Sequence, residues 1–227
     1  METFELHKKL ISLPLFVGMG HEELSEIIAK TKFDFKKANP GETIVREGEK
    51  SGQLLLLVDG DIQTSTYADD HGYEVCEYLR APLALQPERT FGLAQRYSST
   101  VFALTACNII CINKNETLKL SNYSLIFRLN LLNAISTALQ KKYHQDWLSV
   151  PTHLEQRICR FFLSHCIRPA GRKTFKIKMT RIAEELNDNR LNVSHVLNDM
   201  ARKDLLTLHR ERIDIPAIER LSNSAIS

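Results

Sequence analysis

The chain has 227 residues, of which 43% are hydrophobic and 25% are charged, and its net charge at pH 7 is +3. This length exceeds that of a typical single domain, and the apolar residues suffice for two cores, so we expect two domains. No segment approaches the roughly 20 apolar residues that cross a bilayer, and the polar first ten residues do not resemble a signal peptide, which excludes a membrane partner and predicts a cytoplasmic location.

The cysteines and histidines argue against a metal centre and against an enzyme. The five cysteines are odd in number and lack the close spacing of a metal site, so we expect them to be reduced and mainly in the core. A metal-dependent enzyme of the cupin type, the remote alternative, needs clustered histidines, yet His71 is the only histidine between His21 and His144. No glycine-rich phosphate loop or nucleophile motif is present, so we predict no catalytic residues, no metal and no cofactor.

Residues 1–121 are predicted to form a β domain behind one short helix. Leu24 and Ile27 lie on one side of that helix, which is expected over residues 21–31. Short apolar or alternating runs follow between turn-forming residues, at 43–46, 54–58, 62–67, 73–79 and 100–112. The turn at residues 69–72 joins two of these runs as a hairpin. Many short strands at this spacing predict a sandwich or jelly roll.

A long helix is predicted over residues 122–147, with apolar residues at helical spacing on two of its sides. Such a helix is either central in a monomer or lies at an interface, and we favour a two-fold dimer interface. The residues assigned to this interface are Ile126, Leu129, Asn130, Leu132 and Asn133. The two asparagines are expected to set the register of the paired helices.

Pro151 marks a break after this helix and separates residues 148–227 as a further domain. This domain is predicted to begin with a helix at residues 152–165 and a short strand at 175–178. Two short helices joined by a polar turn follow over residues 179–206. A closing β-hairpin after them would complete a winged helix.

Residues 179–206 have the pattern of a helix-turn-helix. The first helix has Ile182, Ala183 and Leu186 on one side. The second helix has apolar residues at the spacing of a one-sided helix, namely Val193, Val196, Leu197 and Met200. An amphipathic helical hairpin packed on any core would show the same pattern. The evidence for DNA binding must therefore come from the residues on the opposite face of the second helix.

The polar turn between the two helices contains three residues with expected roles. Asn187 suits a left-handed residue at the end of the first helix. Asp188 and Asn189 can both accept hydrogen bonds from the free N–H groups of the second helix. Asp188 stands where helix-turn-helix sequences usually have an apolar residue, and we interpret it as a cap.

The opposite face of the second helix carries short hydrogen-bonding side chains, which suit the edges of DNA bases. Its members are Leu191, Asn192, Ser194, His195 and Asn198, with Arg190 at the start of the helix. We expect Arg190 to contact guanine and Leu191 to contact a thymine methyl group. Hydrogen bonds to bases or phosphates are expected from Asn192, Ser194 and His195.

The last segment predicts a wing and supplies phosphate contacts. Residues 208–215 alternate as strands around a turn near 210–212, and Pro216 precedes a last helix at 217–221. The expected phosphate contacts are Arg181, Arg202, Lys203, Arg210 and Arg212. Residues 151–227 contain 14 Lys and Arg against 9 Asp and Glu, whereas residues 1–150 contain 16 against 18. This distribution supports double-stranded DNA as the partner.

The order of these parts resembles the cAMP receptor protein and fumarate-nitrate regulator (CRP/FNR) family of bacterial transcription regulators. The resemblance covers nearly the whole chain. It rests on the segments PGETIVREGE and LLLLVDGDIQ, the acidic hairpin leading into EVCEYLRAP, the TACNIICI strand, the long helix with its proline hinge and the winged helix. It implies an α+β fold with a cyclic-nucleotide-binding-like β-barrel (a double-stranded β-helix or jelly roll) at 1–121, a dimerisation helix at 122–147 and a winged helix-turn-helix at 148–227.

The resemblance also implies how the protein acts. A homodimer of this family bends DNA at a two-fold-symmetric operator, and RNA polymerase is a further partner to consider. By position, Arg190, Leu191 and His195 match the places that read bases in the family. The family usually has Glu and Arg where this chain has Leu191 and His195, so we expect an operator different from the family's standard one.

The effector site departs further from the family pattern. Cyclic-nucleotide binders of the family use a Gly-Glu pair for the ribose and an Arg-Ser or Arg-Thr pair for the phosphate. Here Gln86-Pro87 and Tyr97-Ser98 stand in those places, and Glu88 and Arg96 lie one residue away from them. We therefore expect an effector other than cAMP, either another small molecule or none. The alternatives are a cyclic-nucleotide-responsive regulator through a shifted alignment, and a redox- or haem-sensing regulator, although the N-terminus lacks the cysteine cluster of the iron–sulfur branch.

Overall fold

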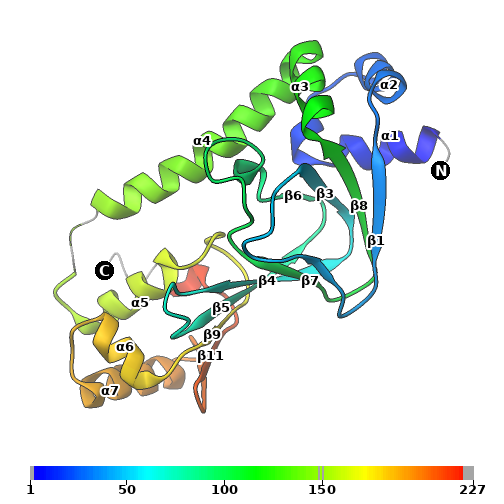
Figure 1. The fold of residues 1–227 in the computed structure, drawn as a ribbon. Helices are drawn as coiled ribbons and strands as arrows, with labels where there is room; N and C mark the ends of the chain where they lie inside the picture. Colours follow the sequence, from blue (N-terminus) through cyan, green and yellow to red (C-terminus); the bar gives the residue numbers. More distant parts are fainter. Residues whose placement is uncertain (1–2, 148, 150, 222–227) are drawn as a thin grey trace. The chain divides into compact units, whose positions relative to one another are not determined.

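The computed structural model describes residues 3–147, 149 and 151–221, and the chain folds as two compact units (Figure 1). The first unit comprises residues 1–62 and 79–146. The second comprises residues 63–78 and 147–227. Among the described helices, none is both long and apolar enough to span a membrane.

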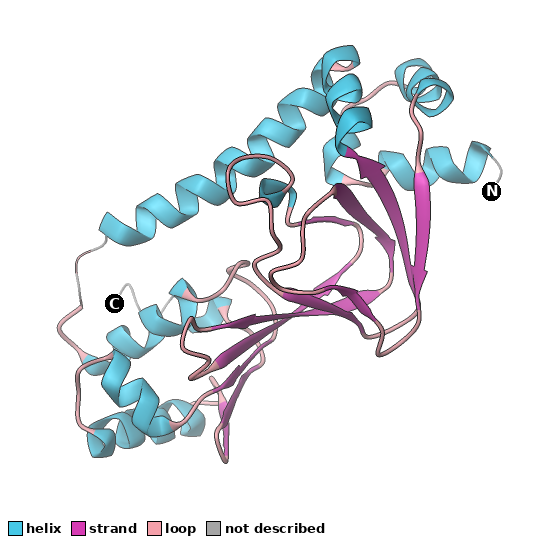
Figure 2. Ribbon diagram, viewed as in Figure 1, coloured by secondary structure: helices cyan, strands magenta, loops and turns pink. Residues whose placement is uncertain are grey.

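The first unit combines helices with two sets of antiparallel strands (Figure 2). Its helices are α1 (Thr3–Ile11), η1 (Pro14–Phe16), α2 (His21–Lys30), η2 (Pro87–Arg89), α3 (Lys114–Tyr123) and α4 (Leu125–Trp147). Its strands are β1 (Asp34–Ala38), β2 (Thr43–Val45), β3 (Gln53–Asp59), β6 (Leu83–Leu85), β7 (Thr100–Ala103) and β8 (Cys107–Asn113). One sheet has the order β1-β8-β3-β6, and β2 pairs with β7. The domain is a jelly-roll-like sandwich, as the sequence predicted, and its sheets do not close into a barrel.

Strand β3 explains why the run LLLLV is apolar without alternation. Leu54 and Leu56 pack on one face of the sheet, in the cluster that contains the helices. Leu55 and Leu57 pack on the other face, inside the sandwich. A strand covered on both faces needs apolar side chains at every position, so the continuous run marks the centre of this unit.

Helix α4 packs on the first unit through one face only. Phe127 is fully buried there, and its ring centroid lies 5.4 Å from that of Phe16. Ile126 packs against the same core, and Asn130 donates hydrogen bonds to the carbonyl oxygens of Leu15 and Val17, at 3.2 and 2.9 Å. Ile126 and Asn130, both predicted to lie in a dimer seam, therefore make contacts within their own chain, and their place in the seam stays a prediction.

The chain also forms a helix that the sequence analysis missed. Helix α3 ends one residue before Ser124, and α4 then begins, so the expected helix from residue 122 is in fact two helices. The start of α3 is capped by Asn113, whose Oδ1 accepts a hydrogen bond from the Glu116 N–H at 2.9 Å. This spacing of Asn and Glu is a known N-terminal signal, so α3 was readable from the sequence.

The second unit is a winged helix with an additional β-hairpin. Its helices are α5 (Leu154–Ser164), α6 (Met179–Glu185) and α7 (Arg190–Arg202). Its strands are β9 (Lys173–Lys176), β10 (Thr207–His209) and β11 (Arg212–Ile215), together with residues 63–78 of β4 (Asp61–Tyr67) and β5 (Glu74–Arg80). The strand order is β10-β11-β9-β5-β4. Residues 219–221 are helical, so the last helix begins two residues later than expected.

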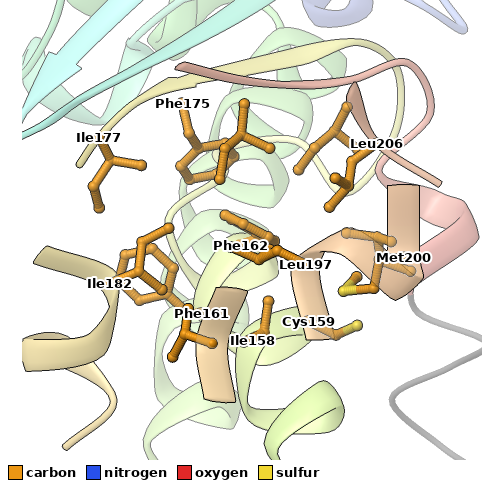
Figure 3. Close-up of a cluster of buried hydrophobic side chains, with 14 of the residues drawn as sticks. Ile158, Cys159, Phe161, Phe162, Phe175, Ile177, Ile182, Leu197, Met200 and Leu206 are labelled. Atoms are coloured by element: carbon orange, nitrogen blue, oxygen red, sulfur yellow. The ribbon is translucent and has the colours of Figure 1, made fainter. Parts of the chain in front are cut away.

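The core of the second unit is aromatic and aliphatic (Figure 3). Phe162 of α5 and Phe175 of β9 are fully buried with ring centroids 4.7 Å apart. From α7, Val193, Leu197 and Met200 are all fully buried in the same cluster. The predicted apolar face of the second helix is thereby confirmed, and the opposite face of α7 is turned away from this core.

Candidate DNA-binding site

The turn between α6 and α7 has the predicted conformation. Asn187 is left-handed, with φ 48°, and the N–H of Asp188 donates to the Ala183 carbonyl at 2.9 Å. Asn189 is the N-cap of α7, since its side-chain oxygen accepts a hydrogen bond from the Leu191 N–H at 2.8 Å. These bonds end α6 and start α7 within four residues, and they fix the angle at which α7 leaves the core.

Asp188 joins the turn to α5, rather than serving as the N-cap that we expected. Its carboxylate lies 3.0 Å from the Arg157 guanidinium of α5. It also accepts hydrogen bonds from the Asn189 N–H at 2.7 Å and from the Asn192 amide at 3.1 Å. Arg157 donates to the Leu186 carbonyl as well. Arg157 was not predicted, because nothing near position 157 signals a partner 31 residues away.

These hydrogen bonds lower the pKa of Asp188, with the Asn192 amide as the largest cause and the Asn189 N–H as the next. A carboxyl with a lowered pKa stabilises the fold above its unfolded pKa, whose usual value is 3.8, and loses this effect as pH falls through the folded pKa. We expect Asp188→Asn to be less stable than the wild type at neutral pH, with a difference that shrinks below about pH 4. Urea unfolding at stepwise lower pH measures this, and a difference independent of pH would contradict it.

The exposed face of α7 carries the expected base-reading side chains. Leu191 is 71% exposed, which is unusual for a large apolar residue on a helix. Arg190 and His195 are also exposed, and no acidic residue in the described part of the chain pairs with Arg190. An unpaired guanidinium and an uncovered leucine at the start of a helix are free to meet a ligand.

The remaining polar residues of this face are partly engaged within the chain. The Asn198 amide donates to the Ser194 carbonyl at 2.7 Å, and the Asn192 amide donates to Asp188. Ser194 is half-buried. The carbonyl oxygen of the Asn192 side chain is not used by these bonds and can act as an acceptor.

The expected phosphate contacts differ in their availability. Lys203 lies 3.1 Å from Glu155, Arg212 lies 2.7 Å from Asp214, and Arg202 pairs with Asp199. Arg210 is exposed at the tip of the β10–β11 wing, and within residues 3–147, 149 and 151–221 it has no acidic partner. Exposed ion pairs of this kind contribute little to the free energy of folding. The lysine or arginine in such a pair can therefore leave its carboxylate and bind a phosphate.

Arg181 is the exception among these cations. Its guanidinium lies 2.8 Å from Asp70 of the β4–β5 hairpin and 2.7 Å from Glu185, with Glu184 at 3.9 Å. The side chain is 30% exposed. Three carboxylates around one guanidinium indicate a structural ion-pair cluster, so the structure argues against the expected phosphate contact of Arg181.

In the loop that corresponds to the family's effector site, the candidate side chains bond to one another. Gln86 is left-handed, with φ 42°, a conformation that glycine adopts most readily, at the place of the family's glycine. Its side chain accepts hydrogen bonds from the Ser98 N–H and hydroxyl at 2.8 and 3.0 Å. It also donates to the carbonyl and hydroxyl of Ser99 at 3.1 and 3.0 Å. Gln86 and Ser98 therefore come together as expected, but they bind each other.

The other candidate effector residues do not converge on this point. Tyr97 is buried in the sandwich interior. Arg96 donates to the Gly48 carbonyl at 2.7 Å, and Glu88 is exposed in η2.

Burial raises the pKa of several cysteine thiols, to about 11 for Cys159, so that they stay protonated at neutral pH.

Comparison with known proteins identifies both domains. A model of the Crp-like helix-turn-helix domain matches residues 156–224. A model of the cyclic nucleotide-binding domain matches residues 35–124. No curated protein matches the chain.

Solved structures of the same fold include the catabolite activator protein of Thermus thermophilus, at 18% identity and a TM-score of 0.53, covering 94% of this chain and 98% of that one. A Crp/Fnr-family protein of Eubacterium rectale is similar at 18% identity and a TM-score of 0.52, covering 95% and 99%. The sensor domain of the regulator DNR of Pseudomonas aeruginosa is similar at 20% identity and a TM-score of 0.52, covering 68% and 100%. With both domain models in the family's order, the chain belongs to the CRP/FNR family of transcription regulators.

Proposed function

We propose that this regulator acts as a homodimer on a two-fold-symmetric operator, and that its effector is not a cyclic nucleotide. The observation that carries the DNA-binding part is the exposed face of α7, where Leu191 is uncovered and Arg190 pairs with no acidic residue among those that the structure describes. Selection of binding sites from random duplex DNA tests it.

Arg190 and Leu191 are the residues we assign to sequence reading. A guanidinium binds the O6 and N7 atoms of guanine through two hydrogen bonds, and an apolar side chain contacts the methyl group of thymine. His195 lies one turn further along the same face and adds a hydrogen bond to a base or a phosphate. Arg210, Arg202, Lys203 and Arg212 are proposed to hold the backbone, where they set affinity and salt dependence without choosing sequence.

The dimer is supported by the face of α4 that its own unit leaves uncovered. Five large apolar side chains on this face are each 48% to 60% exposed, namely Leu125, Leu129, Leu132, Leu139 and Tyr143. Their spacing of four, three, seven and four residues is that of a coiled-coil seam. Asn133 is exposed beside them and can set the register. A second copy of α4 is the occupant that this spacing fits.

Leu132→Glu is expected to convert the dimer into a monomer at micromolar concentration, because it places a charge in the centre of the apolar stripe. Thr137→Glu is the matched control, since Thr137 is exposed on the same helix but off the stripe. Sedimentation velocity measures the mass of both variants and of the wild type. A monomeric wild type, or a Leu132→Glu variant that remains dimeric, would rule out this interface.

The effector proposal rests on Gln86, which stands at the place of the family's ribose-binding pair and makes four hydrogen bonds to Ser98, at the place of the phosphate-binding pair, and to Ser99. We expect 1 mM cAMP or cGMP to leave the Tm unchanged. A ligand at about 1,000 times its Kd stabilises by about 4 kcal/mol, which raises the Tm of a chain of this size by roughly 8–16 °C. Differential scanning fluorimetry with both nucleotides is the measurement, and a saturable rise in Tm would show that the site accepts them.

A further inference from the structure

One segment of the sensory domain folds with the DNA-binding unit. Residues 63–78, the β4–β5 hairpin, lie within the span of the cyclic nucleotide-binding model, residues 35–124. The structure places this hairpin in the second unit, where β5 pairs with β9 (Figure 1). The register is antiparallel over four residue pairs, from Glu74 with Lys176 to Glu77 with Lys173.

The pairing continues from the hairpin to the wing. Val75 lies opposite Phe175 in β9, and Phe175 lies opposite Ile213 in β11. Ile213 in turn lies opposite Leu208 in β10. The hairpin and the wing, which carries Arg210, are thus parts of one sheet.

A buried ion pair fixes the inner end of this pairing. The Glu77 carboxylate lies 2.7 Å from the Lys173 ammonium, and the two side chains are 3% and 0% exposed. The same carboxylate accepts hydrogen bonds from the N–H groups of Ile167 and Arg168, at 2.6 and 3.1 Å. Lys173 also donates to the Ala170 carbonyl at 2.9 Å. Glu77 therefore joins the hairpin to β9 and to the loop after α5.

The rest of the hairpin adds apolar and polar contacts with the same unit. Tyr73 and Val75 belong to the core cluster of the second unit. The Tyr73 hydroxyl lies 2.8 Å from Nε2 of His165, and Lys176 lies 2.9 Å from Glu74. At the tip, Asp70 holds Arg181 of α6. Release of the hairpin would leave the edge of β9 unpaired and would expose the apolar side chains of Tyr73 and Val75. It would also leave the buried Lys173 ammonium without its counter-charge.

We propose that the β4–β5 hairpin is a fixed part of the DNA-binding unit and that Glu77 is a positioning residue for DNA recognition. The hairpin stays paired with β9 when the protein is on DNA. The body that responds to the sensory domain is then the hairpin together with α5–α7 and the wing, joined to the first unit at residues 62–63, 78–79 and 146–147. The part of this proposal that concerns DNA rests on the proposed function above.

Hydrogen exchange tests the first part without DNA. In the full chain, amides of residues 74–77 should open with the same free energy and denaturant dependence as those of 173–176, because paired strands exchange as one unit. Glu77→Gln should speed exchange in both segments and in the wing, at residues 207–215, whereas Asp69→Asn at the exposed hairpin tip should leave all three unchanged. Exchange of 74–77 together with the sandwich strands at 83–113 would overturn the proposal.

A disulfide tests whether the hairpin stays docked on DNA. Cys76 lies directly opposite Thr174, and such strand partners are within the Cα range that a disulfide bridges. For the Thr174→Cys variant, the Kd of the oxidised form for a selected operator should lie within about threefold of the Kd of the reduced form. Wild type treated with the same oxidant controls for oxidation of the other cysteines. A loss of tenfold or more on oxidation would overturn the proposal, since it would require the hairpin to leave β9. Absence of operator binding by the wild type would instead refute the proposed function, while the exchange result would still decide the hairpin's place.

Discussion

Arg190→Ala should weaken operator binding by about 1–3 kcal/mol per half-site and should make one symmetric operator position degenerate. The guanidinium is exposed at the first turn of α7 and has no acidic partner in the described part of the chain, so its removal breaks no ion pair there that could explain the loss. Fluorescence anisotropy gives the affinity, and selection from random DNA gives the motif of the variant.

Arg202→Ala is the control for this experiment. Arg202 lies in the last turn of the same helix and pairs with Asp199. A phosphate contact there should weaken binding to all sequences alike and reduce the salt dependence, without changing the motif. If Arg190→Ala kept the wild-type motif and affinity, the assignment of base reading to this residue would be wrong.

Lys173→Met should destabilise the second unit by about 3–5 kcal/mol, because it leaves the Glu77 carboxylate buried with no counter-charge. The double variant Glu77→Gln with Lys173→Met should recover most of this loss, since a neutral pair of similar volume removes the unpaired charge. Hydrogen exchange at the amides of residues 173–176, measured at increasing denaturant concentration, gives the free energy of unfolding of this unit.

A neighbouring pair provides the comparison for that measurement. Lys176 pairs with Glu74 on the same two strands at 2.9 Å, but its side chain is 51% exposed. Lys176→Met should therefore cost only about 0–1 kcal/mol. Equal losses for Lys173→Met and Lys176→Met would show that burial of the Glu77–Lys173 pair does not determine its strength.

The helix-turn-helix was predictable because its determinants are local. Val193, Leu197 and Met200 are spaced so that one helix face is apolar, and all three are buried. Asn187 is left-handed because its short side chain tolerates that conformation. Asp188 was the one residue that broke the local pattern, and its partner, Arg157, lies on another helix.

The sequence signal failed where a side chain has a distant partner. Glu77 and Lys173 are separated by 96 positions, and each looks like an ordinary charged residue of an alternating strand. Arg181 is predicted to contact phosphate, but three carboxylates surround its guanidinium. Asn130 has the spacing of a dimer seam, yet the carbonyl groups of Leu15 and Val17 accept its hydrogen bonds. A periodic pattern gives the face of a helix but not the partner of that face.

Selection of binding sites by the full chain from random duplex DNA tests the central claim most directly, since it reports DNA binding, symmetry and spacing together. Two α7 helices related by a two-fold axis should recover an inverted repeat with half-site centres about 34 Å apart, which corresponds to one helical turn of DNA. Each half-site should contain a fixed guanine, the partner assigned to Arg190. Recovery of an asymmetric single site, or of no common motif, would contradict the account.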